Sequence, residues 1–371
     1  MGMYFDFSDE QESLRDMVRK FMSNEAPISY VRDMYDDPRG TTPEVWNGLA
    51  GLGLTGILVP EELGGMGLGL VDMGVVLEEL GRAVHPGPFF SSAVAAVSAI
   101  LAVGEKADHA DLLPSIASGE VVATLGLLEA GQRYQWKTPA TQATQVGDGW
   151  QVSGTKTHVP DAFAADLLLV TAATSEGLGL FAVQRADATV TADDVLDGTR
   201  KQATVELTDA PARRVGTADA TVALGTAIDR ILIGTVVDAV GAGQAALDLA
   251  VDYAKNRTQF GSPIGAYQHV QRLLVDTFES VEMSRTAGYY GLWACDDGDP
   301  AEGHRAASMA KAFASDALPA ACADALQSHG GMGVTWEYDS HLFYKRCLSM
   351  QHSLGGAAEH QEEVAAIIAA G

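Results

Sequence analysis

The side chains best suited to bind a metal or to form a disulfide are spread thinly along this sequence. Its three cysteines, at positions 295, 322 and 347, have neither the spacing of a metal site nor the pattern of a disulfide framework. Four histidines of the C-terminal part also fail to share one helical face at a metal-ligand spacing; they are His329, His341, His352 and His360. We therefore expect no metal, and we interpret the cysteines as buried thiols of a protein in a reducing cytoplasm.

The balance of charge sets a second limit on the chemistry. The 371 residues include 49 Asp and Glu but only 24 Lys and Arg, a formal net charge of −25. Nucleic acid and anionic membranes both require a basic face, so we expect neither as a partner. A phosphorylated small molecule is not excluded, because a few well-placed arginines can bind one locally.

No segment is typical of a signal peptide or of a membrane span. The first six residues show no basic region followed by an apolar run. Residues 83–104 carry no Asp, Glu, Lys or Arg, but they contain Pro86 and Pro88. Their apolar part, 89–103, is shorter than the ~20 residues needed to span a bilayer. We expect a buried helix there and no membrane contact.

The elements that must position any site begin with helices. Ser8 and Gln11 have the spacing of a capping box, and apolar residues follow at helical intervals. Further helical patterns occur around residues 46–52 and 72–80, separated by a glycine-rich break at 60–67. These patterns predict an N-terminal helical domain, residues 1–118.

The pattern then changes to short β-prone runs separated by turn residues. The runs are 121–125, 150–152, 167–170, 180–183 and 203–207. Gly147-Asp148-Gly149 has the form of a hairpin turn just before the second run. This spacing predicts a middle antiparallel β-domain, residues 119–216.

Helical periodicity returns in the last part of the chain. Residues 228–254 are apolar on nearly all sides, interrupted by Asp238, Gln244 and Asp248, as expected for a helix inside a bundle. Long helical patterns follow at 267–297, 300–329 and 359–370. They predict a C-terminal helical domain, residues 217–371, and the order of helices, strands and helices indicates an α+β fold.

Six short motifs carry a resemblance to a known family. They are Phe5–Gln11, Val59–Gly67, Leu77–Arg82, Gly154–Thr157, Arg257–Gly261 and Gln327–Gly333. In this order and over the whole chain they resemble the acyl-CoA dehydrogenases. The resemblance implies an N-terminal helical domain, a middle β-domain and a C-terminal four-helix bundle. It also implies α,β-desaturation of an acyl-CoA thioester, in which a carboxylate removes the α-proton and FAD accepts the β-hydrogen as hydride.

The resemblance implies one of two positions for the carboxylate base that this chemistry requires. The family's base is most often a glutamate before a glycine, and the matching pair here is Leu354-Gly355, which cannot take a proton. Glu359 lies five residues further and is expected on a helix surface. Other members place the base before an arginine at the start of the first bundle helix, where this chain has Asp229-Arg230. Asp229 could act as a base with a shorter reach, or it could cap that helix.

The resemblance places the flavin ring against two stretches of the middle domain, and both depart from the family pattern. A Thr-Glu-Pro-Gly-type loop is replaced by Leu127–Tyr134, in which Leu128 offers no hydrogen bond. The Trp and the Thr or Ser that usually follow the Gly-Thr-Lys motif are replaced by His158-Val159-Pro160. His158 could be an acid–base group or a partly exposed residue that fills the Trp position. We expect the ring site of this chain to be incomplete.

In dimers of the family, the C-terminal bundle of one subunit holds the ADP end of the FAD of its neighbour. The residues that the resemblance implies for this half-site are present here. Arg257 matches the arginine that pairs with the pyrophosphate, a task suited to a bidentate guanidinium, although a solvated arginine at a helix end is the alternative. The other residues that match this half-site are Gln259, Phe260, Gln268, Gln327, Gly330 and Gly331. The two glycines are also compatible with a plain turn.

A chain that keeps the donated half-site and lacks much of the ring site favours a heteromeric enzyme. We expect a subunit of an FAD-dependent acyl-CoA dehydrogenase, in an α2β2 assembly where it completes the FAD site of a homologous partner. The alternatives are a homomeric dehydrogenase that uses Asp229 and a scaffold without FAD. The stretch Trp336–Phe343 resembles paired members that act on steroid side-chain CoA thioesters. The usual electron acceptor of the family is an electron-transfer flavoprotein.

Overall fold

The computed structural model describes residues 7–132, 134–217, 219–296 and 298–370. Parts of four predictions therefore lie outside the described residues: the start of the chain, Phe5 and Asp6 of the first motif, one position of the stretch expected near the flavin ring (133), and the end of the helix expected over 267–297. The chain packs as two compact units. We call residues 32–70 and 86–232 the sheet unit, and the remainder the bundle unit.

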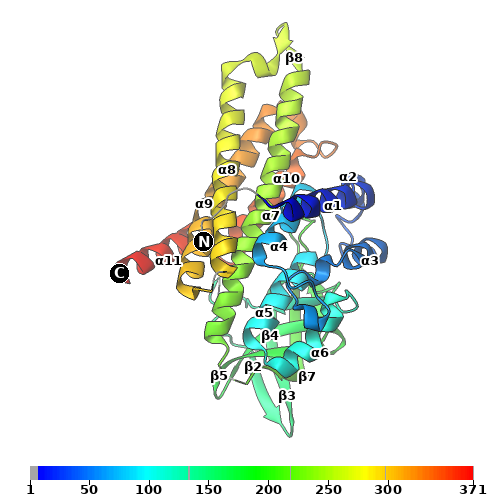
Figure 1. Cartoon of the computed structure of the whole chain (residues 1–371), viewed down its shortest axis with the longest axis vertical. Helices are drawn as coiled ribbons and strands as arrows, with labels where there is room; N and C mark the ends of the chain where they lie inside the picture. The colour runs from blue at the N-terminus through cyan, green and yellow to red at the C-terminus, as the bar shows by residue number, and fades with distance from the viewer. Residues whose placement is uncertain (1–6, 133, 218, 297, 371) are drawn as a thin grey trace. The chain divides into compact units, whose positions relative to one another are not determined.

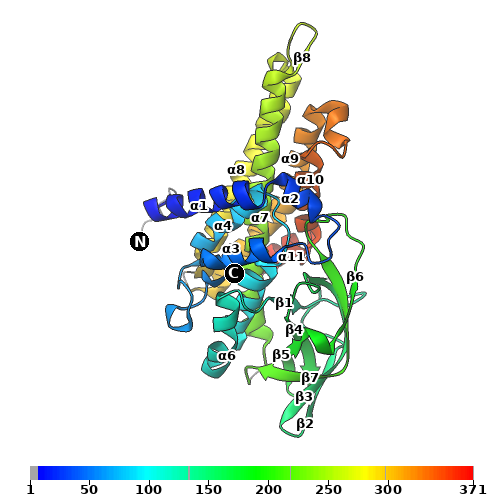
Figure 2. The same ribbon diagram turned by 90° about the vertical axis from the view of Figure 1, so that its right-hand side faces the viewer.

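The sheet unit contains one sheet that closes on itself. Its strands are β1 Ala123–Gly126, β2 Gln142–Val146, β3 Gly149–Pro160, β4 Leu167–Thr174, β5 Gly177–Gln184, β6 Thr189–Ala192 and β7 Gln202–Val215. Around the closed part, β4 pairs with β5, β5 with β7, β7 with β3, β3 with β2, and β2 with β4 (Figure 2). The main pairings are antiparallel, as predicted. The exceptions are β1 and β2, which both run parallel to β4. β6 adds to β7 in the antiparallel direction.

Four of the five predicted β-prone runs lie within strands, and the fifth, 121–125, overlaps β1, which begins at Ala123. The predicted turn at Gly147-Asp148-Gly149 joins β2 to β3. Gly147 has a φ of 60°, which suits glycine. The sequence analysis missed β2 and β6. Both are short and mostly exposed, so neither shows an apolar run or a clear alternation.

Helices also belong to the sheet unit. They are α3 Pro43–Gly51, the 3-10 turns η1 Leu54–Gly56, η2 Glu61–Leu63 and η4 Arg185–Asp187, the π-helix η3 Phe90–Ala96, α5 Val97–Val103 and α6 Lys106–Ala117. The predicted buried helix over residues 89–103 is confirmed, as η3 followed by α5. The hydroxyl of Ser92 accepts a hydrogen bond from the Ala123 backbone at 3.1 Å and ties η3 to β1. No helix within the described ranges has the length and apolar character to cross a bilayer.

Long helices build the bundle unit (Figure 1). They are α1 Asp9–Glu25, α4 Leu70–Arg82, α7 Thr221–Asn256, α8 Gln268–Asp296, α9 Pro300–Ser328, α10 Ser340–His352 and α11 Ala357–Ala370; α7 begins in the sheet unit, and α2 Ile28–Asp33 ends there. Short elements complete the unit: β8 Thr258–Gln259, β9 Ser262–Pro263, η5 Ile264–Ala266 and η6 Gly330–Val334. The capping box at Ser8 is present, as predicted. The sequence analysis missed α10, whose aromatic and polar residues obscure its period.

The three polar residues that interrupt α7 each bind a different helix. Asp238 accepts two 3.0 Å hydrogen bonds from Arg346 of α10, in a pair whose side chains are 4% and 1% exposed. Gln244 accepts from Arg285 of α8 at 2.8 Å. Asp248 pairs with Arg82 of α4 at 2.6 Å. Polar residues in an otherwise apolar helix thus fix its rotation relative to three neighbours.

Glycines bring α4 and α7 into direct backbone contact. A Cβ at Gly81 would lie 1.8 Å from the Asp238 carbonyl oxygen, and a Cβ at Gly241 would lie 1.9 Å from the Glu78 carbonyl oxygen. Any larger residue at either position would force the helices apart.

A buried lysine of α9 binds the C-terminal end of α10. Lys311 of α9 is fully buried, and its ammonium group donates hydrogen bonds to the carbonyls of Met350 and, at 3.4 Å, Gln351. These carbonyls belong to the last turn of α10, where a helix lacks partners for its C=O groups and attracts positive charge. Burial lowers the pKa of Lys311 to about 7, although the Glu359 carboxylate acts in the opposite direction.

Stability should therefore rise with pH between about 7 and 10.5. In that range the unfolded chain binds a proton at this lysine that the folded chain has released, so raising the pH favours the folded state. One such proton gives a slope of at most ~1.4 kcal/mol per pH unit in the free energy of unfolding. Urea unfolding at pH 7, 8, 9 and 10 measures the slope, and Lys311→Met should reduce it. The exposed Lys255→Met is the control, and an equal slope in both variants would contradict the assignment.

Candidate functional site

A two-stranded hairpin joins α7 to α8 (Figure 1), and four of the predicted site residues lie in it or beside it. Thr258 pairs with Pro263 and Gln259 with Ser262, with a tight turn at Phe260-Gly261. Both turn residues have positive φ, 52° and 84°. The Tyr267 hydroxyl donates to the Gln259 carbonyl at 2.9 Å and holds the hairpin against the start of α8.

The hairpin presents its side chains to solvent. Arg257, Gln259 and Gln268 are exposed. Phe260 is 95% exposed, and its ring lies edge-on to that of Tyr267, with ring centres 6.4 Å apart. No carboxylate of the described chain lies within ion-pair distance of the Arg257 guanidinium. An exposed aromatic ring beside an uncompensated guanidinium is the arrangement expected of a surface that receives a partner or a ligand.

The second group of predicted residues, at the end of α9, lies at the same end of the bundle. Thr277 of α8 donates to the Ala321 carbonyl of α9 at 3.3 Å. Because α8 and α9 form an antiparallel hairpin, this register places Gln268 opposite Gly330. The ring of Tyr253, one turn before Arg257, lies 4.8 Å from the ring of His329. The structure thus places Arg257, Gln259, Phe260 and Gln268 at the same end of the bundle as Gln327, Gly330 and Gly331.

Packing among the described residues does not require glycine at the two positions of the second group. A Cβ at Gly330 or at Gly331 would meet nothing within 4 Å. Gly330 has a φ of 59°, which accounts for glycine there as a turn residue. Gly331 has no positive φ, so neither backbone conformation nor internal contact explains it. A ligand or partner close to its backbone would.

Asp229 lies elsewhere, 28 residues before Arg257 on the same helix, or about eight turns. It is buried, with 7% of its surface exposed. The interpretation of Asp229 as a helix cap is wrong, because α7 begins at Thr221 and Asp229 lies in its third turn. At that depth the backbone N–H groups are already bonded within the helix.

Leu354 occupies the turn between α10 and α11 and has a φ of 54°. Its carbonyl lies 3.0 Å from Nε2 of His360, which is fully buried. Glu359 is partly buried at the start of α11, where its carboxylate accepts from the Gly356 N–H at 3.1 Å. The expected surface glutamate is thus a capping residue of α11.

The residues matched to the flavin ring lie together in the sheet unit. The Thr157 N–H donates to the Leu128 carbonyl at 2.9 Å, which sets the 127–131 loop beside β3. Pro160 ends β3, and its carbonyl accepts from the Thr124 hydroxyl at 2.5 Å. The His158 side chain is 61% exposed, and its Nδ1 lies 3.1 Å from Oε1 of Gln202. No side-chain donor at 128 or 160 reaches out from this surface.

A buried ion pair that the sequence analysis missed supports this loop. The Lys156 ammonium donates to Glu129 at 2.8 Å and to the Thr171 hydroxyl at 3.0 Å. Glu129 also accepts from the backbone N–H groups of Ala140 and Thr141, at 2.6 and 3.0 Å. Burial raises the pKa of Glu129, but hydrogen bonds from Lys156 and Thr141 outweigh burial, and the net shift is downward. Lys156 stood in a quoted motif and Glu129 in the ring loop, but nothing in their spacing joined them.

The cysteines and histidines form no centre of their own. Cys322 and Cys347 are buried thiols, with sulfurs 3.4 Å apart, and Cys295 is partly buried. Within the described ranges, no group of three or more His, Cys, Asp or Glu side chains is arranged to hold a metal ion.

Comparison with known proteins decides the family. Residues 8–120 match the model of the acyl-CoA dehydrogenase N-terminal domain, and residues 221–369 match that of the C-terminal domain. Acyl-CoA dehydrogenase IpdE2 of Mycolicibacterium smegmatis is 30% identical over 95% of this chain and 96% of its own length. The chain belongs to the acyl-CoA dehydrogenase family. Acyl-CoA dehydrogenase FadE34 of Mycobacterium tuberculosis is 32% identical over 98% of this chain, which spans about half, 48%, of FadE34.

Solved structures of acyl-CoA dehydrogenases share the fold. A variant of the Tcur3481-Tcur3483 steroid ACAD has a TM-score of 0.89 at 32% identity, over 98% of both chains. The ChsE4-ChsE5 complex of Mycobacterium tuberculosis has a TM-score of 0.89 at 26% identity, over 99% of both chains. The predicted α+β fold, with helical N- and C-terminal parts around a middle β-domain, is confirmed. The family consists of oxidoreductases that act on acyl-CoA and generally use FAD.

Lys156→Met should destabilise this acyl-CoA dehydrogenase chain by roughly 3–5 kcal/mol, because it leaves the Glu129 carboxylate buried without its cation. Urea unfolding, followed by circular dichroism, measures the loss. Glu129→Gln combined with Lys156→Met should recover part of it, since the double variant buries no charge. Lys106→Met, at an exposed position of α6, is the matched control. A loss below about 1 kcal/mol in Lys156→Met would contradict the prediction.

Proposed function

We propose that this chain is one subunit of a heteromeric, FAD-dependent acyl-CoA dehydrogenase and completes the FAD site of a homologous partner. In this proposal the assembly is an α2β2 heterotetramer that desaturates an acyl-CoA thioester between its α and β carbons. The chain contributes the hairpin of β8 and β9 and the end of α9. The partner contributes the flavin-ring surface and the base.

The observation that carries the proposal is the difference between the two half-sites. At the bundle end, Arg257 and Phe260 are exposed and Gly331 is open, so this surface suits a group from outside the chain. At the ring surface, Leu128 and Pro160 have no hydrogen-bonding side chain, and Leu354 stands where most members have the base. A homodimer of such chains would have two weak sites, whereas a pair with a complete partner would have a good one.

The residues at the bundle end fit the ADP portion of FAD. Arg257 would pair with the pyrophosphate through its fork of N–H donors. Gln259, Gln268 and Gln327 would offer amides, and Gly330 and Gly331 would let the backbone approach. FAD, when bound, supplies the acceptor for the β-hydrogen as hydride. The ring surface of this chain fits the flavin ring poorly, and we assign no step to it.

Similar proteins favour a paired enzyme and a steroid substrate. One solved neighbour is a complex named for two components, ChsE4-ChsE5, and another is described as a steroid ACAD. By analogy we propose a steroid side-chain CoA thioester as the substrate and an electron-transfer flavoprotein as the acceptor, in the cytoplasm. We also propose the domain boundaries 1–118, 119–216 and 217–371.

Expression with and without a homologous partner tests the proposal. The chain alone should be colourless or unstable, and coexpression with a family member encoded beside it should give a yellow, active complex. A yellow and active preparation of the chain alone would favour the homomeric enzyme instead. A stable, colourless chain that joins no partner would indicate a scaffold without FAD.

Arg257→Ala should lower the FAD content of the assembled complex. Loss of a charge-assisted contact weakens binding by roughly ten- to a hundredfold. Flavin absorbance per complex after gel filtration under dilute conditions measures the change. Arg305→Ala, which removes an arginine near the start of α9, is the matched control and should retain FAD. Full flavin occupancy in Arg257→Ala would refute the role of Arg257.

Asp229→Asn should leave turnover of the complex within a few-fold of the wild type, because in this proposal the partner supplies the base. If Asp229 were the base, the same change would lower turnover by at least about a hundredfold. Steady-state rates of complexes with equal flavin content measure the effect. Asp229→Glu serves as the conservative companion, since it restores the usual reach and should raise activity only if Asp229 is the base.

A further inference from the structure

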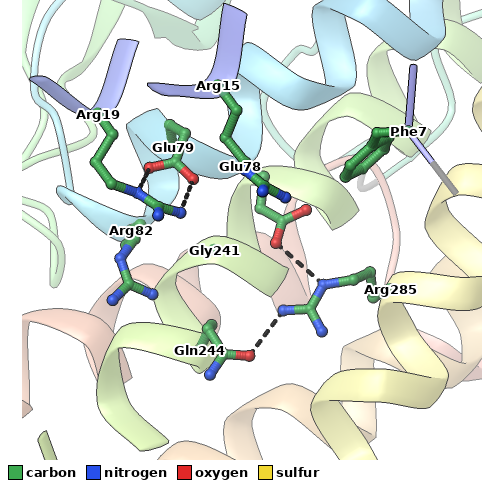
Figure 3. Close-up of a pocket in the computed structure, with 9 residues that line it drawn as sticks. All are labelled: Phe7, Arg15, Arg19, Glu78, Glu79, Arg82, Gly241, Gln244 and Arg285. Atoms are coloured by element: carbon green, nitrogen blue, oxygen red, sulfur yellow. Dashed lines mark hydrogen bonds and ion pairs between the residues drawn. The ribbon is translucent and has the colours of Figure 1, made fainter. Parts of the chain in front are cut away.

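A charged cavity lies within the bundle unit, away from the exposed hairpin at the end of α7. Its volume is about 400 Å³, in the range of small-molecule sites. It is lined by Phe7, Arg15, Arg19, Glu78, Glu79, Arg82, Gly241, Gln244 and Arg285 (Figure 3). α1, α4, α7 and α8 each contribute. None of these residues belongs to the FAD half-site described above.

Local structure explains how the cavity is framed. Arg15 and Arg19 are one turn apart on α1, and Gln11 at the start of α1 donates to Asp72 of α4 at 3.0 Å. This bond and the Arg19–Glu79 pair hold α1 along α4. The floor is close-packed backbone, because Gly241 brings α7 against the Glu78 carbonyl.

Both carboxylates of the cavity are already matched by arginines. Arg19 binds Glu79 in a bidentate pair, with N–O distances of 2.9 and 2.6 Å, and Glu79 is 3% exposed. Arg285 donates to Glu78 at 3.0 Å, and the Tyr289 hydroxyl donates to the same carboxylate at 2.9 Å. Glu78 and Glu79 are therefore neutralised within the lining.

Arg15 and Arg82 supply positive charge in excess. Their carboxylate partners, Glu12 and Asp248, are outside the lining and 43% and 46% exposed, where water weakens the pairing. Arg15 also has a buried Nε that makes no hydrogen bond among the described residues. Arg285 has a third outside partner of this kind, Glu282, which is 42% exposed. Counted over the lining residues alone, four guanidinium groups face two carboxylates and leave two positive charges in excess, in a chain whose net charge is −25.

We propose that this cavity binds a phosphate dianion, either free or as the monoester group of a small molecule. Guanidinium groups present parallel N–H donors that match phosphate oxygens. Two excess positive charges match the two negative charges of phosphate near neutral pH. The Phe7 ring, 5.6 Å from the Arg15 guanidinium carbon, forms an apolar wall at one side.

Titration calorimetry on the full chain, or on its complex where it purifies as one, tests the proposal. Inorganic phosphate and glycerol 3-phosphate are titrated separately against a background of sodium chloride at constant ionic strength. We expect saturable binding of phosphate. Binding of both probes identifies the phosphoryl group of an ester as a ligand, and binding of inorganic phosphate alone identifies the free anion. Binding of neither overturns the proposal.

Variants separate this site from general charge effects. Arg15→Gln and Arg82→Gln leave both pairs with Glu78 and Glu79 intact, and each should weaken binding by roughly ten- to a hundredfold. Arg15→Lys should recover part of the affinity, because it keeps the charge but not the fork. Arg272→Gln removes the same charge from an exposed position of α8 and should bind as the wild type does. Unchanged affinity in folded Arg15→Gln and Arg82→Gln would overturn the proposal, whatever the FAD content.

Discussion

The bundle unit depends on the pair that Asp238 and Arg346 form in its interior. A buried carboxylate or guanidinium alone would be strongly unfavourable, so each requires the other in place. Arg346 also donates to the His85 carbonyl at 2.9 Å, just beyond α4. One ion pair thus links α7, α10 and the end of α4. The close contacts at Gly81 and Gly241 follow from the same arrangement, since α4 and α7 can approach only where side chains are absent.

This constraint fixes which side of α7 faces each neighbour and therefore what its far end presents. With Asp238 bound to α10, Gln244 meets α8 and Asp248 meets α4. Arg257 and the hairpin then extend beyond the supporting helices with exposed side chains. The acyl-CoA dehydrogenase fold here combines a rigid interior with an uncovered end, and the uncovered end is what a second subunit would complete.

The sequence predicted elements well where burial is strong and poorly where it is not. The apolar periods of α7 and of η3 with α5 were clear, whereas β2 and β6 are too exposed to show a period. Asp229 was placed correctly on a helix, but that helix begins well before its apolar run suggested, at Thr221, which removed the capping role. The motifs identified Arg257 and Gly330, but only the register of α8 against α9 shows that both lie at the same end of the bundle.

Pairing between distant positions was beyond the sequence. Glu129 and Lys156 are 27 residues apart, and Arg19 and Glu79 are 60 residues apart. Opposite charges are common, and spacing in the chain does not say which of them meet once helices pack. The Arg-rich cavity was not predicted for the same reason. Glu78, Glu79 and Arg82 stood in one quoted motif, but the other lining residues lie far from them in the sequence.

The number of residues in α7 between Asp238 and Arg257 sets the direction in which the hairpin faces. An α-helix turns about 100° per residue, so inserting one residue after Asp248 would swing the hairpin about a quarter of the way around the bundle. Ala250 and Ala254, which are buried now, would turn away from the positions they fill, and the hairpin would face a different direction. Descendants of this chain can therefore exchange many side chains along that segment, but gene variants that lengthen or shorten it by a single codon should be rare among functional copies.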